Sequence, residues 1–342
     1  MMLDRSYFDD IRGAVYIPVR AFNAFQAWRD YSTEVSARDL GYAKKLNINA
    51  LRIWMSYEFW CRERAKAEER FEDFLRVADS FGMRVMPSFF ECCGREPTEA
   101  NILDTDQFTG TAVRSPGTET TRDRNLWKGP FSFLDTFIER YRNDRRILAF
   151  EVTNEPKTIE DHLFAIALLN RAKSACSDIP ITLGGQTLFD NILYRDSIDI
   201  YQTHENIPLS PFQIEGVLIR AKMVQEMEHK PVWVTEWQQI RKSGVGFSGE
   251  HVDKCELRPN HKSMAAFFRK HGIGNFVWNL MLRPAYLTGQ RSIGTFNGLF
   301  HEDGAVYSLE DARAVAGDDK LQLEERHSLP EFFDRVAALS ED

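Results

Sequence analysis

Eight short apolar segments, separated by stretches with helical periodicity, restrict the fold of this sequence more than any other feature. Each segment is apolar almost throughout and is bounded by turn residues, which is typical of parallel strands buried on both faces. Parallel strands need long crossover connections, and helices usually provide them. The eight segments are residues 13–19, 48–54, 83–90, 147–153, 179–184, 198–203, 231–235 and 274–278.

Most of the intervening stretches repeat apolar residues at helical spacing, and Gly82 and Gly272 stand where two of the helices should end. An open doubly wound sheet would be expected to carry an early Gly-rich phosphate loop, and no such motif is visible. We therefore predict an α/β fold, a single (β/α)8 TIM barrel over residues 1–342 with long loops after the third and eighth strands. The expected helices are residues 36–46, 70–81, 131–141, 159–176, 212–227 and 262–271.

Charge and composition narrow the class of protein. Lys and Arg number 43 against 51 Asp and Glu, a formal net charge of −8, which argues against a nucleic-acid-binding surface. We find neither an apolar run of about 18 residues, as a membrane helix requires, nor a secretory signal. The five cysteines, an odd number at irregular spacing, do not indicate a disulfide framework. We expect a cytoplasmic protein that binds neither nucleic acid nor membranes; its oligomeric state is not readable.

Polar residues follow several of the predicted strands, at the barrel end where active sites lie. Glu155 comes directly after the fourth strand and Glu236 directly after the seventh. Two carboxylates about 5 Å apart can cleave a glycoside by double displacement. Because close like charges oppose each other's ionisation, we expect a raised pKa that keeps the acid protonated. The alternative is that each Glu only stabilises a helix N-terminus.

Other strand ends supply further candidates for substrate binding. An Arg at the end of an apolar strand needs a carboxylate partner, and the flat face of a Trp suits a pyranose ring. The alternatives are a structural ion pair for the Arg, core packing for the tryptophans and a structural role for the His. The candidates are Arg52, Trp54, Glu91, Asn154, His204, Trp237 and Trp278.

Asn154-Glu155-Pro156 at the fourth strand and Thr235-Glu236 at the seventh resemble the signature of the clan A retaining glycoside hydrolases. Within the clan, the sequence is most similar to cellulase-like and endo-β-mannanase-like proteins of the family 5 type. The resemblance covers nearly the whole chain. It implies that Glu155 is the acid/base and that Glu236 is the nucleophile.

The same resemblance implies roles for three other residues. Asn154 would hydrogen-bond the 2-hydroxyl of the sugar, and Arg52 would keep the nucleophile ionised. Trp278 would form the floor of the subsite that holds the reacting sugar.

Two segments depart from the family pattern. The family usually carries His-x-Tyr after strand six, with the Tyr touching the nucleophile, whereas this chain has His204-Glu205-Asn206. We expect another residue, such as Tyr286, to supply the missing hydroxyl. After strand three, Glu91 adds a third carboxylate, which we expect to bind a sugar hydroxyl or to pair with Arg95 or Arg52.

These features together predict a retaining β-glycoside hydrolase that acts on β-linked oligosaccharides or small β-glycosides. Neither a cofactor nor a metal is expected, because the eight histidines are dispersed and no His-x-His motif is present. The alternatives are a non-catalytic carbohydrate-binding barrel and a transglycosidase that uses the same two glutamates. The sequence identifies neither the sugar that the protein would bind nor the linkage that it would cleave.

Overall fold

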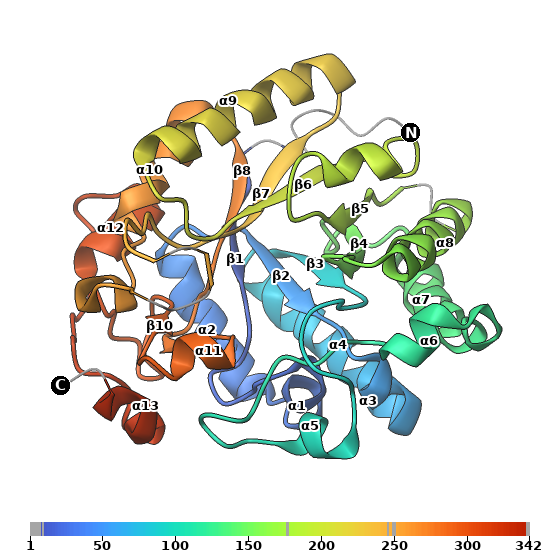
Figure 1. The fold of residues 1–342 in the computed structure, drawn as a ribbon, viewed down its shortest axis with the longest axis horizontal. Coiled ribbons are helices and arrows are strands. Elements are labelled where there is room, and N and C mark those ends of the chain that lie inside the picture. The colour runs from blue at the N-terminus through green and yellow to red at the C-terminus, as the bar shows by residue number, and fades with distance from the viewer. Residues whose placement is uncertain (1–7, 9, 176–177, 245, 248–250, 340–342) are drawn as a thin grey trace.

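The eight predicted strands form one parallel sheet that closes on itself (Figure 1). The computed structural model describes residues 8, 10–175, 178–244, 246–247 and 251–339. Neighbouring strands follow the order β5-β4-β3-β2-β1-β8-β7-β6, and a bridge between Thr182 and Ile200 links β5 to β6. The fold is therefore a (β/α)8 barrel. Its strands are β1 Arg12–Val15, β2 Ala50–Trp54, β3 Arg84–Ser88, β4 Phe150–Asn154, β5 Ile181–Gly184, β6 Tyr201–Glu205, β7 Val232–Trp237 and β8 Gly274–Val277.

Helices surround the barrel, and the six predicted ones are confirmed. Side-chain caps explain several starts: Ser32 accepts from the backbone N–H of Val35, and Ser210 precedes a helix with Pro at its first turn. Gly272 adopts the left-handed backbone conformation and ends the helix that begins at Lys262. The main helices are α2 Thr33–Lys45, α4 Arg64–Ser80, α7 Lys128–Tyr141, α8 Ile159–Ala175, α9 Pro211–Glu228, α10 Lys262–His271 and α12 Leu309–Ala316.

Shorter elements lie mainly in the loops, and no helix among the described residues has the length and apolar character that crossing a bilayer requires. The predicted helix end at Cys176 lies outside the described residues. The shorter elements are α1 Ala24–Arg29, α3 Tyr57–Arg62, α5 Glu99–Leu103, α6 Thr118–Arg122, η2 Arg124–Leu126, η3 Asp190–Tyr194, η4 Lys254–Leu257, β9 Arg283–Pro284, α11 Thr288–Arg291, β10 Phe296–Asn297, η5 Glu331–Phe333 and α13 Asp334–Ala338.

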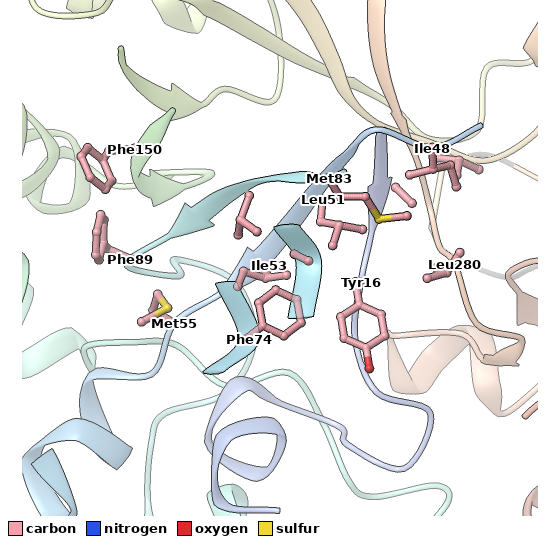
Figure 2. Packing of buried hydrophobic residues seen from close by; sticks show 14 of the residues in the cluster. Tyr16, Ile48, Leu51, Ile53, Met55, Phe74, Met83, Phe89, Phe150 and Leu280 are labelled. Atoms are coloured by element: carbon pink, nitrogen blue, oxygen red, sulfur yellow. The ribbon is translucent and has the colours of Figure 1, made fainter. Parts of the chain in front are cut away.

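Side chains alternate between the two faces of each strand. On β2, Leu51 and Ile53 point to the layer of helices, where Figure 2 shows them among other buried apolar side chains. Ala50 and Trp54 belong instead to a second cluster that fills the barrel and includes Trp233. Arg52, between Leu51 and Ile53, is likewise turned inward and fully buried. The alternation thus places a guanidinium group inside the barrel.

The connection between β5 and β6 differs from the prediction of eight strand–helix units. It contains only the short 3-10 helix η3. Asn191 anchors this segment, because its side chain exchanges hydrogen bonds with the backbone N–H and C=O of Gln202. At this point of the outer layer, between α8 and α9, the barrel therefore has η3 in place of an α-helix.

The long loops after β3 and β8 form one end of the barrel. Two fully buried arginines of the β8 loop bind other loops through backbone carbonyls: Arg283 donates to Pro18 O (3.1 Å) and Arg291 donates to Gln107 O (2.8 Å). Because Gln107 belongs to the β3 loop and Pro18 follows β1, these contacts join three loops into one wall.

Candidate active site

The ends of β4, β6 and β7 bring Glu155, His204 and Glu236 together. One carboxylate oxygen of Glu155, one ring nitrogen of His204 and one carboxylate oxygen of Glu236 all lie within 4.8 Å of one another. Their side chains are only 13%, 3% and 8% exposed. This spacing agrees with the separation of about 5 Å that double displacement on a glycoside requires. The two predicted carboxylates therefore do converge at the mouth of the barrel.

Glu155 lies one residue beyond β4 in the left-handed backbone region, with φ of 43°. A non-glycine residue rarely adopts this conformation, which costs on the order of 1–3 kcal/mol and is found mainly at functional sites. A hydrogen bond from its backbone N–H to Gly184 O (2.7 Å) holds the turn. The turn directs the side chain toward β6.

Arg52 links the carboxylates from inside the barrel. Its Nη1 donates to Glu236 Oε1 (2.7 Å), its Nε and Nη2 donate to the two oxygens of Glu151 (2.8 and 2.7 Å), and Nη2 also donates to Asn154 Oδ1 (2.7 Å). The guanidinium lies 4.6 Å from the ring centroid of Trp54. The predicted contact between Arg52 and Glu236 is present, whereas the second partner, Glu151, was missed. A charged residue within the apolar fourth strand was the signal for it.

Glu155 accepts several hydrogen bonds. His204 Nδ1 lies 2.6 Å from Oε1, while Cys93 Sγ and Gln186 Nε2 donate to Oε2 (3.1 and 2.9 Å). Burial alone would raise the pKa of Glu155, but the hydrogen bond and charge of His204, with the other donors, hold that pKa well below its ordinary value. The expectation that like-charge repulsion raises the pKa of the acid is therefore wrong for Glu155.

The proton of this pair belongs mainly to His204. Burial alone would lower the pKa of His204, but the charge of Glu236 and the hydrogen bond to Glu155 raise it above its ordinary value. Because the two groups lie 2.6 Å apart, they titrate as one unit that holds one proton. The pKa of the Glu91 carboxyl group is raised to about 7; burial is the main cause, and the charges of Glu155 and Glu236 add to it.

Asn206 contacts Glu236 at the position where the family pattern has Tyr. Its Nδ2 donates to Glu236 Oε2 (3.0 Å). Tyr286, the expected substitute, packs instead against Trp278 with ring centroids 5.4 Å apart. The position after His204-Glu205 is therefore filled by an amide, which satisfies the second oxygen of Glu236 without a hydroxyl group.

Glu91 is buried and orients Asn154. It accepts from both the backbone N–H of Cys93 (2.6 Å) and the side-chain amide of Asn154 (3.1 Å). Among the described residues it makes no ion pair with Arg52 or Arg95, so the expected pairing is wrong, whereas a contact with a sugar hydroxyl stays a prediction. Because Arg52 binds Asn154 Oδ1 at the same time, the Asn154 amide is held at both ends.

The aromatic candidates divide into two groups. Trp54 and Trp278 pack edge to face, with ring centroids 5.8 Å apart. A small cavity of about 40 Å³ lies beside them, lined by Trp54 and Tyr286 among others. Trp237 is 1% exposed, packs against Phe268 of α10 and donates to Asn275. Trp237 therefore fills the layer between barrel and helices, and we do not retain it as a substrate-binding residue.

Glu155, His204 and Glu236 are also the group among the described residues whose donor atoms lie close enough to share a metal ion. Each carboxylate oxygen already accepts a hydrogen bond, and the guanidinium of Arg52 lies 2.7 Å from Glu236. A fixed positive charge at that distance opposes a second cation. The arrangement therefore suits proton transfer and nucleophilic attack better than metal binding.

Comparisons with known proteins give the fold a wider context. No family model matches the chain, and no curated protein matches its sequence. Among solved structures, the endo-β-1,4-mannanase from Thermotoga petrophila matches with a TM-score of 0.58 and 13% identity over 91% of this chain and 76% of that chain. The chain has the fold of glycoside hydrolases of family 5.

Two further structures have the same fold. GH5_18 from Streptomyces cattleya, in complex with GlcNAc, matches with a TM-score of 0.59 and 16% identity over 96% of this chain and 87% of that chain. An exo-β-1,4-mannosidase from an Opitutaceae bacterium matches with a TM-score of 0.62 and 14% identity, over 99% of this chain and 63% of that chain. The resemblance seen in the sequence is thus confirmed at the level of the fold.

Proposed function

We propose that the protein is a retaining β-glycoside hydrolase in which Glu236 is the nucleophile and Glu155, paired with His204, is the acid/base. The observation that carries the proposal is the approach of the two carboxylates to within 4.8 Å at the mouth of the barrel. The fold shared with glycoside hydrolases supports it.

In the first step, a carboxylate oxygen of Glu236 attacks the anomeric carbon. The bond to the leaving oxygen breaks with its electron pair, and that oxygen takes the proton held by Glu155 and His204. In the second step, the pair accepts a proton from water, whose oxygen attacks the anomeric carbon and releases Glu236. Two inversions leave the configuration unchanged.

The charges around the pair suit both steps. Arg52 donates a charge-assisted hydrogen bond of 2.7 Å to Glu236, which orients this carboxylate before attack. Once Glu236 is an ester, it no longer carries the negative charge that raises the pKa of His204. The pair then loses its proton more readily, so it is in the basic form when water must be activated.

The neighbours suggest which sugars to test first. A mannanase and a mannosidase, both acting on β-1,4 linkages, share this fold. We propose β-1,4-linked mannosyl oligosaccharides as the first substrates, tested beside β-glucosides and β-xylosides of equal length. Asn154 would bind the sugar 2-hydroxyl, and Trp278 with Trp54 would contact the ring.

Replacing Glu155 by alanine tests the proposal. Hydrolysis of an oligosaccharide, whose leaving group needs protonation, should fall about 10²–10⁴-fold because the general acid is lost. The first step on a dinitrophenyl glycoside, whose leaving group needs no proton, should stay near the wild-type rate. Azide should restore turnover with a β-glycosyl azide as product. An equal loss on both substrates would contradict the role of Glu155.

The pH dependence follows from the His204–Glu155 pair. Because the pKa of His204 is raised, its proton is present at low pH and is lost only as the pH rises above the ordinary value for histidine. Oligosaccharide hydrolysis should therefore fall on the alkaline side, whereas dinitrophenyl glycosides should show little of this loss. In His204→Gln, the alkaline limb of kcat/KM should move to lower pH. A wild-type profile that is the same for both substrates would refute this assignment.

A further inference from the structure

The outer face of α9 is apolar, although it points to solvent. Its inner face is apolar as expected, with Ile214, Val217 and Leu218 buried against the barrel. A helix that is apolar on both faces is normally covered on both. The outer residues are Phe212, Ile219, Met223 and Met227, which are 86%, 48%, 57% and 74% exposed.

The neighbouring elements η3 and α8 carry exposed apolar residues as well. The connection between β5 and β6, which carries η3 instead of an α-helix, lies between α8 and α9 (Figure 1). We call the ten residues together the apolar face. They are Phe212, Ile219, Met223 and Met227 of α9, Phe189, Ile192 and Leu193 at η3, and Ile159, Leu163 and Ile166 of α8.

Side-chain contacts show that the three elements adjoin. The phenol of Tyr194 on η3 hydrogen-bonds the ring of His162 on α8. At the same end of η3, the next residue, Arg195, pairs with Glu228 of α9 (2.8 Å). The apolar face is therefore spread over adjoining elements rather than scattered around the barrel.

The other main helices of the outer layer do not expose large apolar side chains in this way. Among the described residues, α2, α4, α7, α10 and α12 contribute no large apolar side chain that is exposed. Single exposed apolar residues are normal on a protein surface, but a concentrated group of them marks an interaction site.

Two charged residues at the edge of the apolar face already have partners within this chain. Glu215 of α9 pairs with Lys270, and Lys173 of α8 pairs with Asp199 (2.6 Å). Because these charges are neutralised within the chain, the partner surface should be apolar too. A second copy of the same face meets that condition.

We infer that the apolar face is a dimer interface between two copies of this chain. Side chains 39–86% exposed present on the order of 900 Å² in total, close to the roughly 800 Å² per partner of a stable interface. A stripe along one helix is self-complementary about a two-fold axis, because two antiparallel α9 helices place Phe212 of each copy toward Met227 of the other. This inference is independent of the proposed activity.

Sedimentation velocity over a range from nanomolar to high micromolar protein tests it. The wild-type chain should sediment as a dimer, and the double variant Ile219→Glu with Met223→Glu should raise the dimer dissociation constant by on the order of 100-fold or more, because it places buried charges against each other. Both side chains are exposed, so circular dichroism and the melting temperature of the monomer should not change.

Leu126→Glu is the matched control, because Leu126 is 42% exposed on η2, outside the apolar face. This variant should dimerise like the wild type. Footprinting at high concentration should also protect Met223 and Met227. A wild-type chain that stays monomeric at every concentration would overturn the inference, as would a double variant that dimerises unchanged.

Discussion

Replacing Glu236 by alanine should lower hydrolysis of β-glycosides by on the order of 10⁴-fold or more, with substrates of every leaving group affected. Without this carboxylate no covalent intermediate forms, so good leaving groups cannot compensate. This pattern distinguishes the variant from Glu155→Ala, which should spare the first step on activated substrates. Steady-state kinetics on an oligosaccharide and on a dinitrophenyl glycoside measure the difference.

Glu205→Ala is the matched control for this prediction. Glu205 lies at the end of β6, next in sequence to His204, yet the positive charge that acts on it most strongly is that of Arg220 on α9. Its loss should change kcat/KM by less than about 10-fold. Wild-type activity in Glu236→Ala would remove Glu236 from the mechanism.

Replacing Arg52 by methionine should lower the free energy of unfolding by about 3–5 kcal/mol, the largest stability effect we expect from one substitution. Arg52 is fully buried and donates to both Glu151 and Glu236. Its removal takes away the guanidinium from which the buried carboxylates of Glu151 and Glu236 both accept hydrogen bonds. Urea unfolding followed by fluorescence measures the loss, and activity should fall as well, because Glu236 would lose the hydrogen bond that Arg52 donates to it.

The control for Arg52 is an exposed ion pair. Arg62 and Glu99 lie 2.6 Å apart with side chains 43% and 64% exposed. Arg62→Ala should change the free energy of unfolding by no more than about 1 kcal/mol. If Arg52→Met lost no more than this control, the buried network would not have the role that we assign to it.

Strand positions could be predicted from the sequence because each strand is an almost unbroken apolar run. The convergence of Glu155 and Glu236 followed from the barrel, since the carboxyl ends of parallel strands meet at one rim. The sequence did not show that the connection between β5 and β6, where a regular (β/α)8 barrel has an α-helix, would carry only a short 3-10 helix. The backbone of that segment is held by Asn191, a tertiary contact that periodicity does not reveal.

Side-chain partners were harder to predict than strand positions. Trp237 follows Glu236 directly, yet alternation along β7 turns the two residues to opposite faces, a consequence that the sequence pattern already contained. Cys93 and Gln186 bind Glu155 from two different loops. Loop geometry determines these contacts, so no spacing in the sequence predicts them.

The direction of the pKa shift of Glu155 could not be predicted from the sequence either, because it too depends on loop geometry. Two nearby carboxylates alone would raise one of the two pKa values, but the distance of 2.6 Å between His204 and Glu155 reverses the effect for Glu155. That distance depends on the left-handed turn after β4. Residue types alone, without that turn, predict the proton on Glu155, whereas it lies mainly on His204.

The configuration of the azide product from Glu236→Ala tests most directly the claim that this side chain attacks the anomeric carbon. With a dinitrophenyl β-glycoside as substrate, azide can enter the space left by the carboxylate and displace the leaving group from the opposite side. We predict an α-glycosyl azide, identified by the anomeric coupling in its NMR spectrum. A β-glycosyl azide, or no rescue by azide, would contradict the assignment of Glu236 as the nucleophile.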